Sequence, residues 1–165
     1  FADVATISND PKDPSPSLST GGWLRDLDDE TIDLLLDWGV SVQGSCPFTV
    51  VEIRHAGGAI ARVDKHANAY SHRDETLLFN LIGMTPTPER YQKAQEYGQA
   101  FKQVLGDHLS GGVYMNFMGG EEARARTRDG YLPENFARLQ ALKAKYDPQN
   151  RFCFGYNIPA VERNE

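Results

Sequence analysis

The chain has 165 residues, a formal net charge of −6, 40% hydrophobic residues and 24% charged residues. This length and composition are typical of one globular domain that buries its own core. The acidic balance argues against a nucleic-acid partner, because proteins that bind nucleic acids carry a basic face. The apolar runs are all much shorter than the roughly 20 residues that span a bilayer, so we expect no transmembrane helix and no membrane partner.

Cys46 and Cys153 lie far apart in the sequence and match no metal-binding or redox spacing. We expect buried thiols, and a disulfide between them stays an alternative. His66 and His72 have aspartates nearby but no metal-ligand spacing, so we expect loop histidines and no metal site. The chain starts at Phe1 and shows no signal-peptide pattern. We therefore expect an excised or processed fragment, and the two thiols favour a cytoplasmic location.

The first 22 residues are rich in Asp, Pro, Ser, Thr and Gly, a composition typical of turns. We therefore expect residues 1–22 to form a linker or surface loop. A helix should follow, starting after Leu27 with an aspartate as its N-terminal cap and ending at Gly39. Three apolar residues share one face of this helix and should point to the core: Ile32, Leu35 and Leu36.

Several later segments have the pattern of β-strands. Residues 47–55 alternate with a period of two and are rich in β-branched side chains, which predicts a strand. An extended pattern resumes over residues 59–63, after a Gly-Gly pair. Further strands are expected at about residues 76–84 and over residues 111–118.

The remaining elements are expected to be helices. One covers about residues 88–105, with Thr87 as its cap and a proline in its first turn. A short polar helix is expected over residues 121–128, and a longer one starts at Pro133. The buried side of the longer helix should carry Phe136, Leu139, Leu142 and Tyr146. The order of elements indicates an α+β fold, an antiparallel sheet covered on one face by α-helices.

The run Tyr114-Met115-Asn116 places a phenol and a carboxamide two positions apart. On a strand these side chains would project from the same face, side by side. Such a pair suits the edge of a planar heteroaromatic ring, because the amide both donates and accepts hydrogen bonds. Spacing alone favours the simpler interpretation of a half-exposed strand face. The sequence has no Gly-rich phosphate loop and no nucleophile elbow, so we expect no dinucleotide site wholly inside this chain.

The segment 68–74 gathers polar and aromatic side chains directly before an expected strand. Loops at strand ends often line sites. A plain surface loop is the alternative interpretation.

Four motifs resemble, in the same order, those of berberine-bridge-enzyme-like oxidases. They are the Gly57–Val63 stretch with residues 68–74, similar to GGAV-x-RV and TAFPHRD; Tyr114-Met115-Asn116-Phe117, similar to YxN; residues 136–152, similar to YxRLxxLKxKYDPxNxF; and Asn157-Ile158-Pro159, similar to QNI. Each motif is weak alone. The ordered set covers about residues 22–160 and is specific.

The resemblance implies the C-terminal portion of an FAD-linked oxidase of the vanillyl-alcohol-oxidase-type class. Residues 23–120 would then be part of a substrate-binding α+β domain whose sheet roofs the flavin ring. Residues 121–165 would be the C-terminal berberine-bridge-like segment. The main FAD-binding domain would lie outside this chain, and Cys46 would not be a flavin-linking cysteine.

The resemblance also implies roles for single residues. Tyr114 would be catalytic, accepting or polarising the proton of a substrate hydroxyl as a hydride moves to the flavin. Asn116 and Asn157 would bind the cofactor. The substrate pocket would include Tyr70, His72 and Asn80. A tyrosine base needs its pKa lowered from about 10 by positive charge or hydrogen bonds, and the sequence does not identify the group that does so.

Some members of the family use a glutamate shortly before the aromatic segment instead. Here that stretch reads His66-Ala67-Asn68 and holds no acid.

We therefore expect an FAD-dependent oxidoreductase when complete, acting on an alcohol, sugar or secondary-metabolite carbon, with oxygen as the electron acceptor. The flavin performs the redox step and the protein positions the small-molecule substrate. Alone, the chain should be inactive and bind no FAD, and its open sheet could support a homodimer. The alternatives are a non-catalytic ligand- or partner-binding module and a purely structural α+β domain.

Overall fold

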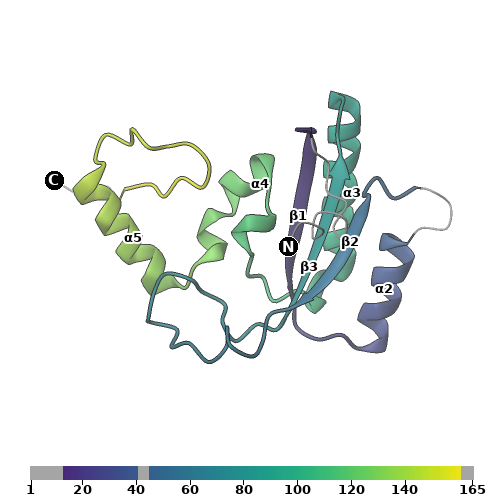
Figure 1. Cartoon of the computed structure of the whole chain (residues 1–165), viewed down its shortest axis with the longest axis horizontal. Helices are drawn as coiled ribbons and strands as arrows, with labels where there is room; N and C mark the ends of the chain where they lie inside the picture. The colour runs from purple at the N-terminus through teal and green to yellow at the C-terminus, as the bar shows by residue number, and fades with distance from the viewer. Residues whose placement is uncertain (1–12, 41–44, 161–165) are drawn as a thin grey trace, which may run out of the picture.

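The computed structural model describes residues 13–40 and 45–160 (Figure 1). Strands β1 (Ser17–Leu24), β2 (Val50–His55) and β3 (Leu77–Met84) form a three-stranded antiparallel sheet in the order β1-β3-β2. The α-helices are α2 (Asp29–Gly39), α3 (Pro88–Leu105), α4 (Gly120–Ala125) and α5 (Pro133–Tyr146). Three short 3-10 helices are η1 (Gly106–His108), η2 (Met115–Phe117) and η3 (Thr127–Gly130). In Figure 1, α2 and α3 lie on one side of the sheet, and α4 and α5 lie on the other. The predicted α+β fold is confirmed.

The sheet buries apolar side chains on both faces. On the face covered by α3, Phe79 of β3 packs edge-on against Phe101, with ring centroids 6.0 Å apart. On the opposite face, Trp23 and Leu78 pack with Phe117 of η2. We call this second side the open face, because no long helix covers it. It is the face on which the candidate site lies.

Helices α2 and α3 start where the sequence predicts. The Asp28 carboxylate accepts a hydrogen bond from the Thr31 backbone N–H at 2.8 Å, which caps α2. Thr87 accepts one from the Arg90 N–H at 3.3 Å, and Pro88 opens α3. These local bonds satisfy backbone donors that have no partner within the helix.

The buried faces of two helices differ from the predicted ones. In α2, Ile32 and Leu36 are 36% and 54% exposed, and Leu35 is the buried apolar residue. The rotation follows from Trp38, whose ring stacks on Phe101 of α3 and turns Leu35 inward. In the helix from Pro133, Phe136 is buried as predicted. Two of its predicted partners, Leu142 and Tyr146, are exposed, because α5 extends away from the sheet (Figure 1).

Three expectations about strands and loops are wrong. Residues 17–22, expected in a loop, form most of β1; residues 1–12 lie outside the described part. Gly21 suits this strand because a Cβ there would lie 2.4 Å from the Phe79 carbonyl oxygen. Residues 59–63 form turns, with a bond from the Arg62 N–H to the Gly58 carbonyl.

The predicted strand over residues 111–118 is also absent from the structure. The Ser110 N–H donates to the Trp23 carbonyl at 3.0 Å, next to a single bridge between Leu109 and Leu24 of β1. Gly111 then takes a φ of 91°, a left-handed conformation that turns the chain away from the sheet edge. The residues that follow lead into η2 across the open face.

Cys46 is half-buried and Cys153 is exposed, and both are free thiols. The expectation of burial is therefore wrong for Cys153, and the alternative of a disulfide is wrong as well. No helix in the described ranges is long and apolar enough to cross a membrane.

Candidate functional site

A pocket of about 310 Å³ lies beside the open face of the sheet. Segments far apart in the sequence meet there: β1, the loop before β3, η2 and the chain after η3. The aromatic and polar side chains that line it are those of Trp23, Tyr70, Ser71, Tyr114, Asn116 and Tyr131. The structure thus brings together three of the predicted site residues, Tyr70, Tyr114 and Asn116.

Tyr114 and Asn116 lie side by side, although not on a strand. Tyr114 is the N-cap of η2, and Asn116 is in the middle of this 3-10 turn. The Asn116 amide donates a hydrogen bond to the Tyr114 hydroxyl oxygen at 3.0 Å. The turn therefore produces the phenol–carboxamide pair that we expected from strand geometry.

Three aromatic rings hold the Tyr114 ring edge-on. The centroid distances are 6.1 Å to Trp23, 6.3 Å to Tyr70 and 5.0 Å to Phe117, with interplanar angles of 72°, 71° and 84°. Edge-to-face contacts of this kind are favourable because the positive ring edge meets the negative ring face. They restrict the direction of the phenol within the pocket.

Two guanidinium groups lie over aromatic rings that themselves contact the Tyr114 ring. Arg54 lies 4.8 Å above the Phe117 ring, and Arg73 lies 4.6 Å above the Tyr70 ring. Burial raises the pKa of the Tyr70 phenol, so Tyr70 is a neutral hydrogen-bonding group in the pocket. Arg54 also pairs with Glu52 at 2.9 Å, and Arg73 donates to Asn68 Oδ1 at 2.9 Å, so both guanidiniums are held in place beside these rings.

A row of polar side chains crosses the open face of the sheet. Ser19 donates to Asn80 Oδ1 at 2.9 Å, and the Asn80 amide donates to Glu52 Oε1 at 2.9 Å. Arg54 also donates to Glu52, and this bond lowers the carboxyl pKa. Asn80 is only 1% exposed and does not line the 310 Å³ pocket, so its amide orders the sheet beneath the site.

Glu52 and Arg54 were missed from the sequence. The available signal was a Glu and an Arg two positions apart in a strand otherwise rich in β-branched residues. Such residues project from one face of a strand. Trp23 and Tyr131 were also missed, because neither lies in a polar cluster.

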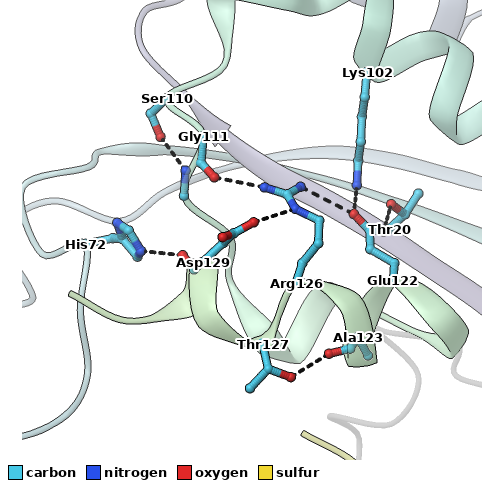
Figure 2. Close-up of polar contacts among 11 residues, drawn as sticks. Thr20, His72, Lys102, Ser110, Gly111, Glu122, Ala123, Arg126, Thr127 and Asp129 are labelled. Atoms are coloured by element: carbon cyan, nitrogen blue, oxygen red, sulfur yellow. Dashed lines mark hydrogen bonds and ion pairs between the residues drawn. The ribbon is translucent and has the colours of Figure 1, made fainter. Parts of the chain in front are cut away.

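His72 lies outside the pocket. Its Nε2 is 2.8 Å from the Asp129 carbonyl oxygen (Figure 2). A Cβ at Gly112 would lie 2.6 Å from the His72 ring, so the imidazole packs directly on the backbone there. His72 therefore joins the loop before β3 to the C-terminal segment.

Figure 2 shows the polar network that anchors this segment. Arg126 donates to Asp129 Oδ2 at 2.8 Å and pairs with Glu122 at 3.5 Å. Glu122 accepts a hydrogen bond from Thr20 Oγ1 at 2.5 Å and forms an ion pair with Lys102. Helix α4 is thereby tied to β1 and α3, which fixes where η2 lies over the sheet.

The C-terminal tail reaches back to η2. The Tyr156 hydroxyl bonds to the carbonyl of Met115 and, at 3.0 Å, to that of Met118, on either side of Asn116. The next residue, Asn157, is half-buried, and its Oδ1 is buried with no hydrogen-bond partner among the described residues. An unpaired buried acceptor suits a ligand N–H.

No group of three His, Cys, Asp or Glu side chains in the described ranges is placed to hold a metal ion. The polar groups of the site are phenols, amides, an indole and guanidiniums. Such groups donate and accept hydrogen bonds around an organic ligand.

The amino-acid sequence of this chain is similar to those of several known proteins. Residues 113–159 match the family model described as "Berberine and berberine like". The chain is 30% identical over 152 residues to a glucooligosaccharide oxidase of Sarocladium strictum, covering 82% of this chain and 29% of that protein. It is 28% identical over 99 residues to the FAD-linked oxidoreductase dpmaF of Metarhizium anisopliae, covering 58% of this chain and 19% of that protein.

Solved structures share the fold. A chitooligosaccharide oxidase superposes with a TM-score of 0.71 at 22% identity, over 90% of this chain and 33% of that one. The resemblance to berberine-bridge-enzyme-like FAD-linked oxidases inferred from the motifs is confirmed by the family-model match and by these relatives, and the solved structure shows the same fold. The chain spans less than a third of the length of the two curated relatives named above.

Proposed function

We propose that the chain forms the substrate-facing part of an FAD-dependent oxidase that converts a hydroxyl-bearing carbon of a small molecule into a carbonyl. The hydroxyl would belong to a sugar, an alcohol or a secondary metabolite. The observation that carries the proposal is the meeting of Tyr114, Asn116 and Tyr70 around one pocket. Relatives named as oxidases of sugars support the reaction class.

In this proposal, Tyr114 reacts as the phenolate, having given its own proton to solvent, and accepts the proton of the substrate hydroxyl as the hydride leaves the substrate carbon. Asn116 stabilises the phenolate before the transfer, because its amide donates to that oxygen. The neutral Tyr70 phenol forms a wall that orients the substrate.

The cofactor would be FAD, held mainly by a domain elsewhere in a longer polypeptide. The polar groups here suit the edge of a flavin ring, since Asn157 Oδ1 is buried with no partner in the part of the chain that the structure describes and Asn116 has an exposed carboxamide. Bound FAD supplies the acceptor for the hydride that leaves the substrate carbon. This chain contributes the groups that hold the ring edge and move the proton.

The partner of the C-terminal segment would be that flavin-binding domain. Tyr146, Phe152 and Phe154 are 72%, 81% and 92% exposed. Large aromatic side chains exposed to this extent typically mark an interface. All three lie in the 113–159 range that matches the family model.

The full-length protein provides the test. Purified protein should show a flavin absorption band that bleaches when the protein is mixed anaerobically with an oxidisable sugar such as maltose, or with another substrate from a panel of alcohols. A full-length protein that has no flavin band, yet binds small molecules in calorimetry, would favour the non-catalytic binding module instead.

A further inference from the structure

Trp23 carries a hydrogen-bond donor that the described residues leave unused. Its side chain is 1% exposed, and Nε1 is buried with no acceptor among those residues. Buried indole N–H groups normally have a partner, because removing them from water without one costs free energy. The unused donor sits in a residue that forms part of the pocket wall.

The neighbours of Trp23 explain why no acceptor is available. Its ring packs with Ala56, Leu78 and Phe117, which offer only apolar groups, and edge-on against Tyr114. None of these contacts uses the indole N–H, so the packing alone does not account for a tryptophan donor at this position.

We propose that the Trp23 N–H donates a hydrogen bond to an oxygen of the bound substrate, an oxygen separate from the one that Tyr114 deprotonates. Trp23 and Tyr114 rings lie 6.1 Å apart, so one small molecule can reach both side chains. Trp23 then selects substrates with a second acceptor oxygen close to the oxidised carbon, over simple alkyl alcohols. The inference rests on the proposed function.

The main test compares Trp23→Phe with wild type in the full-length protein, using maltose as the probe. The variant keeps an aromatic ring and loses the N–H donor together with part of the ring volume. KM should rise on the order of three- to tenfold, the effect of one neutral hydrogen bond, while kcat stays close to wild type. Trp38→Phe, at the chain's other tryptophan between α2 and α3, is the control and should leave both constants unchanged.

A second measurement needs no turnover. The variant also loses ring volume, so the quantity to compare is the rise in unfolding temperature that maltose produces in each protein. That rise should be smaller for Trp23→Phe than for wild type, because only wild type gains the hydrogen bond, and equal rises would overturn the inference. An unchanged KM for Trp23→Phe would overturn it too. If neither maltose nor the other alcohols reduced the flavin of the wild type, that result would count against the proposed function instead. The comparison of unfolding temperatures between wild type and Trp23→Phe would then decide the inference alone.

Discussion

Asn116 donates a hydrogen bond from its carboxamide to the phenolic oxygen of Tyr114, over 3.0 Å. Because the oxygen accepts this bond, the phenolic proton is free to face another group. The same bond would strengthen if the phenol became negatively charged. In the proposed function, this arrangement would let the pair take part in proton transfer.

The first prediction concerns the Tyr114 hydroxyl. Tyr114→Phe in the full-length protein should slow substrate-driven flavin reduction by about 10²- to 10⁴-fold, the usual contribution of a general base. Stopped-flow absorbance of the flavin measures this step directly. Tyr97→Phe, which removes a phenol of α3 that donates to the Trp38 carbonyl away from the pocket, is the control and should stay near the wild-type rate. Equal rates for wild type and Tyr114→Phe would remove Tyr114 from the mechanism.

The second prediction concerns the buried amide of Asn80. Asn80→Asp would place a carboxylate against Glu52, whose Oε1 now accepts the Asn80 amide at 2.9 Å. Two adjacent carboxylates repel, so we expect a loss of about 1–3 kcal/mol in unfolding free energy at pH 7. Repulsion raises carboxyl pKa values in the folded state, so the loss should shrink as the pH falls and one group binds a proton.

Urea denaturation at pH 7 and at pH 4 measures this difference. Asn116→Asp makes the same chemical change at an exposed position and should alter stability by less than about 0.5 kcal/mol. A similar loss in both variants would contradict the special role of the Asn80 environment.

The third prediction concerns the ion pair between Lys102 and Glu122. Burial lowers the pKa of Lys102 and the Glu122 carboxylate opposes that shift. Glu122→Gln leaves a buried ammonium without its counter-charge, so the unfolding free energy at pH 7 should fall by about 3 kcal/mol. The loss should diminish as the pH rises, because the unpaired lysine gives up its proton.

Glu121→Gln, one residue earlier and exposed, is the control for this pair and should behave as wild type. The measurement is chemical denaturation at pH 7 and pH 9.5. A loss in Glu122→Gln that did not diminish at the higher pH would mean that Lys102 charge is not the cause.

The fourth prediction concerns how Asp147 holds the tail. A hydrogen bond from Lys143, at 2.5 Å, and bonds from the backbone N–H groups of Phe152 and Arg151 lower the pKa of Asp147 from 3.8 to about 2. Because folding lowers this pKa, the stabilisation is fully present above about pH 4 and is lost as the pH falls through 2.

Asp147→Asn should therefore speed proteolytic cleavage after Phe152 at neutral pH, since the tail is less firmly held. Wild type and variant should become alike near pH 2 in unfolding temperature. Asp74→Asn, at an exposed loop position, is the control. Equal cleavage of Asp147→Asn and wild type at pH 7 would show that the carboxylate does not secure the tail.

Local sequence signals were sufficient for the helices. Caps such as Asp28 and Thr87 act on backbone groups within the same turn, so short-range chemistry decides where a helix begins. Which face is buried depends on the neighbour instead. Trp38 stacks on Phe101 and orients α2, a contact between residues 63 positions apart in the chain, and no periodicity within α2 reveals it.

The motifs of the sequence by themselves determined the family resemblance, the sheet-and-helix class and the Tyr114–Asn116 pair. Only the tertiary structure decided that this pair sits on a 3-10 turn, because Gly111 redirects the chain after one bridge to β1. It also decided that Trp23 and Tyr131 line the pocket beside this pair and the predicted Tyr70, and that His72 does not. A pocket is built from residues distant in sequence, and their approach depends on sheet register and helix packing, which local patterns do not encode.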